Sequence, residues 1–414
     1  MKRIRHAVPV LMLLLSPALT GCWGDDDRGA AVYGKPLAEQ LKAAVAETRA
    51  AGSARFTATV EYNAPTSTAR HVTTGTLDFA HGTSRAELTR EIPSDFPVDA
   101  APRLDRNGAA YPLTLATAGT DVYARGDDGV WLHWPQAARK ALDPKGEAPV
   151  SAHAPGRVLP FGGTLAELVA AAVPRQEPLR REGGAREYAA TVPLGRAQDL
   201  LPSRIGPKTD SKAYVDEQLP LTVVLDAHGR LLSADVDLVT LLEQVNGSRH
   251  QSMQGMPGVT GLHATLTLSE HGEPAGIRTP DRARTADARR SAADVKTRPR
   301  GTCAVPTAGL ADAARVRVVG CDRPHTMRVF KTTGTSDAGR ITPARYLADT
   351  CDAPYRRLPA AWKRGAQEPY GHLVAIRSSS FRMRFDSSGK VTGPEPKLAM
   401  DVVCYVRTPA TGTR

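Results

Sequence analysis

The spacing of apolar residues predicts one helix followed by many short strands. Leucine and valine recur every fourth position from Leu37 to Val45, which predicts an amphipathic helix over 35–50. From Phe56 to Tyr62 the period changes to two, because apolar residues alternate there with polar ones. Alternation of this kind is typical of a strand with one buried face. The chain therefore enters a β-sheet directly after its first helix.

Similar patterns predict the other elements of this region. Further helices are expected over 163–173 and 194–201. Further strands are expected over 71–80, 84–89, 121–125, 130–134, 187–192 and 263–269. A hairpin is expected where the apolar runs 221–225 and 231–238 flank a turn that contains Gly229. Because these connections are too short for parallel crossovers, the sheet is expected to be antiparallel.

The N-terminus has the organisation of a bacterial lipoprotein export signal. Positive residues stand at positions 2, 3 and 5, an apolar run covers 8–19, and the sequence Leu19-Thr20-Gly21-Cys22 follows. This arrangement resembles a signal peptide with a lipobox, in which the Cys22 thiol takes a thioether-linked diacylglycerol. The alternative is an ordinary signal peptide with an incidental cysteine. The run is shorter than the ~20 residues of a membrane span.

Export changes the meaning of the composition. The 414 residues carry a formal charge of +11, which by itself invites a nucleic-acid function, and three of these charges would leave with the signal peptide. The mature protein would begin at Cys22, on the outer face of the cell membrane, held there by its acyl chains. We therefore expect membrane lipid and envelope molecules as partners, and no nucleic acid.

A basic stretch divides the rest of the chain. Between Pro274 and Arg300, eight basic residues face three acidic ones, and large apolar residues are almost absent. This composition predicts an extended, solvated linker over 273–300. Attraction to anionic envelope polymers or to lipid headgroups is an alternative role for it.

The region before this linker resembles the LppX/LprG-type envelope lipoproteins, which are related in shape to the LolA lipoprotein carriers. The resemblance covers 35–272 and rests on the lipobox, on the strand 56–60 after a helix, and on the segment 221–230. It implies a curved antiparallel sheet with helices on its concave face, often around an apolar cavity for acyl chains. The strand residues suit such a cavity and a dry core equally well.

All four remaining cysteines follow the linker, at positions 303, 321, 351 and 404. An even number in an exported chain favours two disulfides, for which three pairings exist. Cys303, Cys321 and Cys351, together with His325, also have the ligand types of a zinc site. No Cys-x₂-Cys knuckle accompanies them, so disulfides are favoured and zinc is the alternative.

The sequence Cys321-Asp322-Arg323-Pro324-His325 is similar to the Cys-Asp-x-Pro-His motif of the septum-formation domain of exported actinobacterial-type proteins. Gly301-Thr302-Cys303 matches the opening of that family, whereas the acidic residue and Glu-Val pair expected after the histidine are replaced by 326–329. The resemblance covers 301–407 and implies a small α+β module. We expect it to pair Cys303 with Cys321 and Cys351 with Cys404, and His325 to be structural.

No catalytic constellation stands out. A Gly-x-Ser-x-Gly elbow, a Walker loop and a His-Glu-x-x-His motif are all missing from the sequence. Asp226 and His228 belong to a turn, where polar residues are common. Asp235 and Asp237 would share one face of a strand, and we expect them to be solvent-exposed. No catalytic residue, metal or cofactor is therefore expected.

Together these patterns predict an α+β protein of the cell envelope that binds or carries a lipid or another amphiphile. Two alternatives remain, a non-enzymatic interaction protein of cell division or wall assembly, and a cryptic envelope hydrolase. The expected organisation is a signal peptide over 1–21, a tether over 22–34, an LppX/LolA-like domain over 35–272, the linker over 273–300, the disulfide domain over 301–407 and a tail over 408–414.

Overall fold

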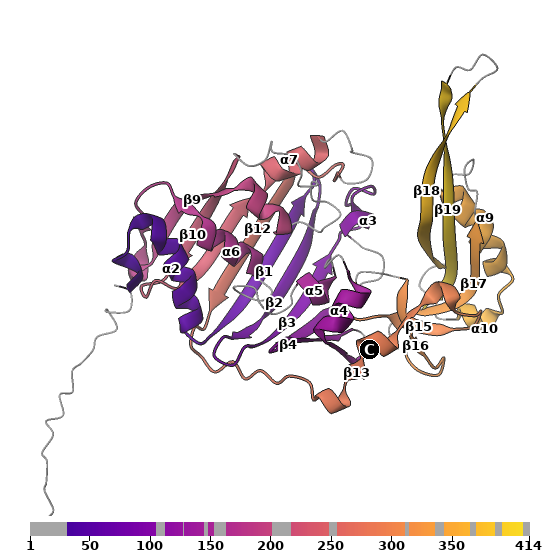
Figure 1. Cartoon of the computed structure of the whole chain (residues 1–414), viewed down its shortest axis with the longest axis horizontal. Coiled ribbons are helices and arrows are strands. Elements are labelled where there is room, and N and C mark those ends of the chain that lie inside the picture. The colour runs from indigo at the N-terminus through magenta and orange to yellow at the C-terminus, as the bar shows by residue number, and fades with distance from the viewer. Residues whose placement is uncertain are drawn as a thin grey trace, which may run out of the picture.

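The computed structural model contains two modules, each built around its own β-sheet (Figure 1). We call the part with the 13-stranded sheet the first module and the part with the six-stranded sheet the second module. The structure describes residues 31–104, 112–126, 128–144, 148–152, 163–200, 217–247, 255–310, 314–335, 343–364, 370–385 and 391–408. The expected lipid-attachment residue, Cys22, lies outside these residues.

The first module is a large, curved sheet whose strands are almost all antiparallel to their neighbours. Its strands are β1 (Ser53–Asn63), β2 (Thr68–Asp78), β3 (Thr83–Glu91), β4 (Leu113–Ala118), β5 (Asp121–Arg125), β6 (Trp131–Trp134), β7 (Val173–Pro174), β8 (Leu179–Arg180), β9 (Arg186–Pro193), β10 (Gln218–Leu225), β11 (Leu231–Asp237), β12 (Gly261–Ser269) and β13 (Ala286–Asp287). In space they run β13-β6-β5-β4-β3-β2-β1-β12-β11-β10-β9-β7, and β8 pairs with β9. Among the described residues of this sheet, β13 and β6 are the only parallel pair.

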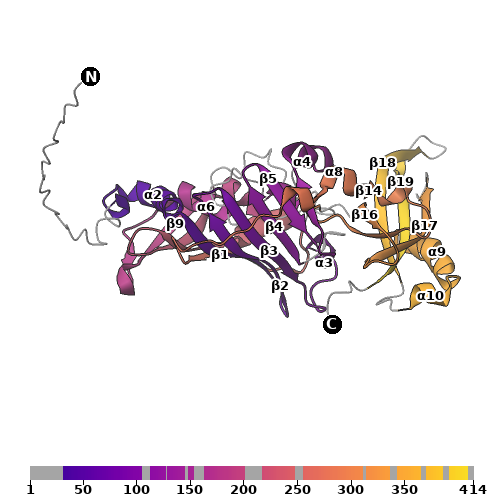
Figure 2. The ribbon, with the colours of Figure 1, turned by 90° about the horizontal axis from the view of Figure 1, so that it is seen from below.

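Helices lie on one face of this sheet. The helices of the first module are α2 (Leu37–Ala50), α3 (Ala101–Leu104), α4 (Gln136–Leu142), α5 (Pro149–Ala152), α6 (Gly163–Ala171) and α7 (Val239–Gly247), and its 3₁₀ segments are η1 (Glu182–Gly184) and η2 (Leu194–Leu200). Figures 1 and 2 show α2, α4 and α6 on the same side of the strands. Apolar residues of α2, α6 and α7 join the inward residues of the strands in one core. We call this side of the sheet the helix face.

The opposite side of the sheet is polar, as the alternation along the strands predicts. On β1, residues 54, 56, 58, 60 and 62 point to the helix face, so Thr57, Thr59 and Glu61 point away from it. Their cross-strand partners on β12 are Thr267, Thr265 and His263. A sheet with one buried face and one polar face is what antiparallel strands of this pattern form.

Most predicted elements of the first module are confirmed. The first helix, the strands predicted after it, and the hairpin of β10 and β11 all form where the periodicity places them. In that hairpin Gly229 has φ +78°, a backbone conformation that glycine adopts without strain. Strand β4 and helix α7 were not predicted. The sequence of β4, Leu-Thr-Leu-Ala-Thr-Ala, gives a weak signal because Ala116 and Thr117 are buried next to Leu115, so buried apolar and exposed polar residues do not alternate along it.

The basic segment 273–300 differs from the extended, solvated linker that we expected. It contains η4 (Arg282–Arg284), α8 (Ala288–Ser291), β14 (Ala292–Asp294) and η5 (Val295–Thr297) besides β13. Strand β13 pairs with β6 of the first sheet, and β14 pairs with Arg315–Arg317 of the second. Ala288 is buried in the first core and Val295 in the second. The physical reason is that two small apolar residues suffice to anchor a segment whose charged side chains stay in water.

The second module is a six-stranded sheet with helices. Besides β14, its elements are β15 (Cys303–Pro306), β16 (Arg315–Val319), β17 (Met327–Thr335), α9 (Pro343–Arg356), α10 (Ala360–Lys363), β18 (Gly371–Phe385) and β19 (Val391–Arg407), and the strand order is β14-β16-β15-β17-β19-β18. Disulfides join Cys303 to Cys321 and Cys351 to Cys404, which is the expected pairing. The second one ties α9 to β19, because Cys351 lies in the helix and Cys404 in the strand.

A packed interface joins the two modules. The loop after β15 reaches the first core, where Ala308 and Leu310 are buried. The indole of Trp134 donates a hydrogen bond of 3.2 Å to the carbonyl of Ala308, and Arg317 forms an ion pair with Asp128. Both side chains of that ion pair are largely buried. Within the ranges that the structure describes, no helix has the length and apolar character needed to cross a membrane.

Candidate functional site

The middle of the helix face is less covered than its ends. On β1, Phe56 and Tyr62 are only 4% and 1% exposed, whereas Ala58 and Val60 between them are partly exposed. Thr73 and His71 on β2 are the cross-strand partners of Ala58 and Val60, so they lie on the same face. We call Ala58, Val60, His71 and Thr73 the central strip.

The described helices pack mainly on the two ends of the sheet, on either side of the central strip. Helices α2, α6 and α7 contact strands β7, β9, β11 and β12, and α4 and α5 contact β5 and β6. Apolar side chains at the centre of a sheet are normally packed to high density. Partial exposure of Ala58 and Val60 there leaves apolar surface that a ligand can cover.

Two nitrogen-bearing side chains lie at one end of this strip. His71 pairs across the strands with Arg90 of β3, so both belong to the helix face. The His71 ring stands edge-on to Tyr62, with 5.3 Å between ring centroids. Arg90 donates a hydrogen bond from Nη1 to the carbonyl of Leu104 at the end of α3. The basic side chain of Arg90 therefore lies beside the central strip, on its β3 side.

Burial controls the charge of His71. Its Nε2 is buried and has no hydrogen-bond partner among the described residues. Burial, and secondarily the nearby charge of Arg90, lower the pKa of His71 from 6.5 to about 3. The imidazole is thus neutral at physiological pH and adds no charge to the strip.

This low pKa predicts a loss of stability in mild acid. Below pH 6.5 His71 binds a proton in the unfolded chain, whereas in the folded protein it binds one only near pH 3. The contribution of His71 to the free energy of unfolding is therefore fully present above pH 6.5 and is lost as pH falls. By pH 5 the free energy of unfolding should fall by about 2 kcal/mol from this residue alone. Urea titrations at pH 7 and pH 5 should show the fall in the native protein and a smaller one in His71→Gln.

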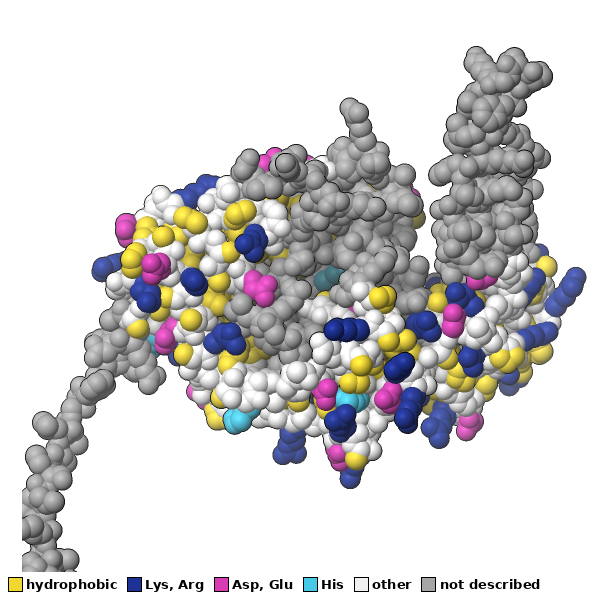
Figure 3. Space-filling model, in the orientation of Figure 1, with side chains coloured by type: hydrophobic (Ala, Val, Ile, Leu, Met, Phe, Trp, Pro, Cys, Tyr) yellow, Lys and Arg dark blue, Asp and Glu magenta, His cyan; other side chains and the backbone are white. Residues whose placement is uncertain are grey.

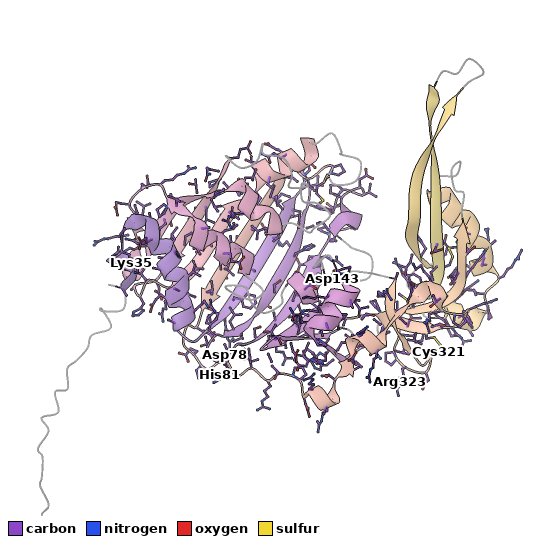
Figure 4. The ribbon with its side chains drawn as sticks, viewed as in Figure 1. Lys35, Asp78, His81, Asp143, Cys321 and Arg323 are labelled. Atoms are coloured by element: carbon purple, nitrogen blue, oxygen red, sulfur yellow. A yellow bond between two sulfur atoms is a disulfide. The ribbon has the colours of Figure 1, made fainter. Side chains whose placement is uncertain are left out.

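His81→Gln is the matched control for this experiment. His81 is exposed in the β2–β3 turn, where its Nδ1 lies 2.9 Å from the Asp78 carboxylate (Figure 4). Its removal should leave the difference between pH 7 and pH 5 almost as large as in the native protein. An equal pH dependence in His71→Gln and the native protein would contradict the assignment.

The acidic residues singled out in the sequence do not come together as a catalytic pair. Asp235 lies 2.8 Å from Nε2 of His263, and burial raises its pKa while His263 lowers it. Asp237 instead accepts a hydrogen bond from the backbone of Val239 at the start of α7. Asp226 accepts backbone hydrogen bonds from His228 and Arg230, which closes the β10–β11 turn.

The cysteine-rich motif forms a turn. Figure 4 shows Cys321 and Arg323 close together in the second module, at the turn between β16 and β17. Nδ1 of His325 lies 2.8 Å from the carbonyl oxygen of Arg323, which is the backbone contact expected for a structural histidine. Because Cys303 and Cys321 are bonded to each other, they are not available as zinc ligands. Among the described residues, no three His, Cys, Asp or Glu side chains are grouped so that they could hold a metal ion.

Basic side chains are concentrated near the module interface. Figure 3 shows Lys and Arg side chains gathered in the lower right part of the molecule. In the segment 273–300 they are exposed at Arg278, Arg282, Arg284, Arg289, Arg290 and Arg300. The predicted attraction to anionic envelope molecules stays a prediction.

Sequence reasoning did not identify the central strip or the module interface. Ala58 and Val60 were predicted only as inward residues of a strand, and inward residues that meet a packed core have the same pattern as those that meet a gap. Trp134 and Ala308, whose hydrogen bond joins the modules, lie far apart in the sequence, and no local signal joins them.

Comparisons with known proteins add little. No protein-family model matches the chain, and no curated protein matches its sequence. Similar solved structures include an uncharacterized conserved protein from Thermus thermophilus, with 10% identity over 60% of this chain and 98% of that one and a TM-score of 0.25. The MucA/MucB complex of Pseudomonas aeruginosa also matches, with 10% identity over 90% of this chain and 95% of the matched chain and a TM-score of 0.23.

A candidate outer membrane lipoprotein-sorting protein domain from Vibrio parahaemolyticus also matches. It has 12% identity over 58% of this chain and 95% of that one, with a TM-score of 0.23. Likeness at these TM-scores carries no conclusion about fold or function.

Proposed function

We propose that the first module binds the apolar part of an amphiphile, such as a lipid acyl chain, along the central strip. The observation that carries this proposal is the partial exposure of Ala58 and Val60 between the buried side chains of Phe56 and Tyr62 on β1. Covering apolar surface stabilises a complex by about 25 cal/mol per Å². The neutral His71 beside Val60 keeps this end of the strip free of a second positive charge.

We propose further that the protein works outside the cytoplasmic membrane and is attached to it through Cys22. The charged start of the chain, its apolar run and its lipobox support this location. Two disulfides support it as well, because such bonds persist in oxidising compartments. A binding role, rather than catalysis, is supported by the structural partners of Asp226, Asp235 and Asp237.

The finer family assignment is part of the same proposal. We propose that the first module is of the LppX/LprG type and that the second is of the septum-formation type. The lipobox and the β10–β11 hairpin support the first assignment. The Cys321–His325 motif, whose cysteine is bonded to Cys303, supports the second.

Filling the strip should weaken ligand binding. Val60→Trp adds a large ring where apolar surface is exposed, so it should weaken binding of a fluorescent fatty acid about tenfold or more, which corresponds to about 1.4 kcal/mol. Thr59→Trp is the control, because residue 59 is next to Val60 but lies on the opposite, polar face. Native mass spectrometry of protein extracted from membranes should detect lipid on the native chain and on Thr59→Trp, but not on Val60→Trp.

The proposal fails if the native protein binds no fatty acid and carries no lipid. It also fails if Val60→Trp binds as well as Thr59→Trp while both keep the native melting temperature. In that case the central strip would be a loosely packed part of the core.

A further inference from the structure

An open pocket lies in the second module, far in the sequence from the central strip. Its volume is about 450 Å³, and it lies between the end of α9 and the start of β18. Asp352, Tyr355 and Arg356 line it from the helix, and Tyr370 and His372 line it from the strand side. Its size is within the range of small-molecule sites.

A disulfide holds the two walls of the pocket together. Cys351, directly before Asp352, is bonded to Cys404 of β19. Cys404 is in turn the cross-strand partner of His372 on β18. Both cysteines are fully buried. The helix and the strand are therefore fixed relative to each other at the point where the pocket lies.

One wall of the pocket is aromatic. The rings of Tyr355 and Tyr370 have centroids 5.4 Å apart and are inclined by 50°. Phe330 of β17 packs behind both, at 5.9 Å from Tyr355 and 6.3 Å from Tyr370. Both tyrosines are partly exposed, so they present ring surface toward the pocket while Phe330 is buried.

The polar groups of the pocket comprise both donors and acceptors. Tyr370 hydrogen-bonds Asp352, and burial together with this contact raises the pKa of Tyr370 to about 12, so the phenol stays protonated. Burial lowers the pKa of His372, as does Arg407, so its ring is neutral near pH 7 and both donates and accepts. Arg356 donates only, and the Asp352 carboxylate accepts only.

The pocket carries charges of both signs. Arg356 is positive, and so is Lys363, whose Nζ lies 4.9 Å from the Tyr355 ring and donates to the Arg356 carbonyl. The Asp352 carboxylate, which lines the same wall as Arg356, is negative. A neutral molecule with many hydroxyl groups can use the guanidinium and the carboxylate at once.

We propose that this pocket binds a neutral sugar ring of a glycan. A pyranose has one apolar face of C–H groups, which pack on the electron-rich faces of aromatic rings such as Tyr355 and Tyr370. Its edge carries hydroxyl groups, each of which donates and accepts, and these match Asp352, Arg356 and His372. Hydrogen bonds to charged groups are the stronger ones, so Arg356 and Asp352 are the residues that determine affinity.

The test is binding of soluble neutral oligosaccharides to the full exported chain. Saturation-transfer NMR with chitotriose and with cellotriose should show contact with ring C–H protons, and titration should give a dissociation constant. Arg356→Gln should raise that constant about tenfold or more, because it removes a charged hydrogen-bond donor. Arg357→Gln is the control, since Arg357 is its exposed neighbour and does not line the pocket.

Two results would overturn the proposal. One is the absence of binding by either sugar at millimolar concentration. The other is an equal effect of Arg356→Gln and Arg357→Gln, which would place binding elsewhere. Spermidine and citrate serve as charged probes in the same titration, and displacement of the sugar by either at equal concentration would also contradict a site for neutral rings. Fatty-acid binding at the central strip is independent of all these outcomes.

Discussion

Replacing Gly309 with alanine is expected to separate the two modules while leaving each of them folded. Gly309 lies in the loop that enters the first core, and Val150 donates a backbone hydrogen bond of 3.2 Å to its carbonyl. A Cβ atom on Gly309 would lie 2.9 Å from the Cβ of Ala124 and closer still to Cγ1 of Val150. Its φ of +90° is also a strained conformation for alanine.

The expected cost is large for so small a change. Overpacking a filled site costs about 1–3 kcal/mol, and an unfavourable backbone conformation adds about 1–3 kcal/mol. Both atoms that would clash belong to the first module, whereas Gly309 belongs to a loop of the second. Withdrawal of the loop removes the clash, so the interface should open before either sheet unfolds.

Small-angle scattering should therefore report a larger radius of gyration for Gly309→Ala, and the amide of Val150 should exchange faster. Gly301→Ala is the control. Gly301 has a similar φ of +94°, but the nearest atom to its added Cβ, in the Trp362 ring, would be 3.9 Å away. Gly301→Ala should keep the native radius and the slow exchange of Val150. Equal behaviour of the two variants would show that backbone strain, rather than packing between the modules, dominates.

Removing the Cys351–Cys404 disulfide should destabilise the second module by about 4 kcal/mol. The bond closes a loop with a sequence separation of 53, and in the chain-entropy model such a loop restricts the unfolded chain by that amount. The double variant Cys351→Ala/Cys404→Ala also leaves small gaps in the core formed with Phe330, Leu358 and Val402. Both the lost restriction of the unfolded chain and the gaps in the core lower the stability of the second module.

The second disulfide provides the comparison. Cys303 and Cys321 have a separation of 18, for which the same model gives about 3 kcal/mol. Hydrogen exchange followed by mass spectrometry should show faster exchange in peptides of α9 and the end of β19 for the Cys351/Cys404 variant. The Cys303/Cys321 variant should affect mainly β15 and the turn between β16 and β17. Unchanged exchange in α9 would contradict the prediction.

Local periodicity predicted most of the first sheet because each strand has one buried face. Phe56 and Tyr62 alternate with Thr57 and Glu61, and this alternation is independent of which strand becomes the neighbour. The pairing of β1 with β12 was beyond such reasoning, since it joins residues about 200 positions apart. Nothing in either strand alone selects the other.

The linker shows where composition misleads. Its charges predicted a solvated chain, and most of its arginines are indeed exposed, but Ala288 and Val295 are buried in different cores. A single small apolar residue has no periodic signal. Whether such a residue is buried depends on which other part of the folded protein packs against it.

The sequence alone determined the order of the local elements, the expectation of an export signal that ends at Cys22, and the expectation of two disulfides among the four cysteines after position 300. These features depend on residue type and spacing along the chain. Only the tertiary structure decided that Ala58 and Val60 are left partly uncovered, that Tyr355 and Tyr370 form one wall of a pocket, and that Gly309 enters the first core. Each of these depends on the volume left between elements distant in sequence, and volume is set by packing in three dimensions.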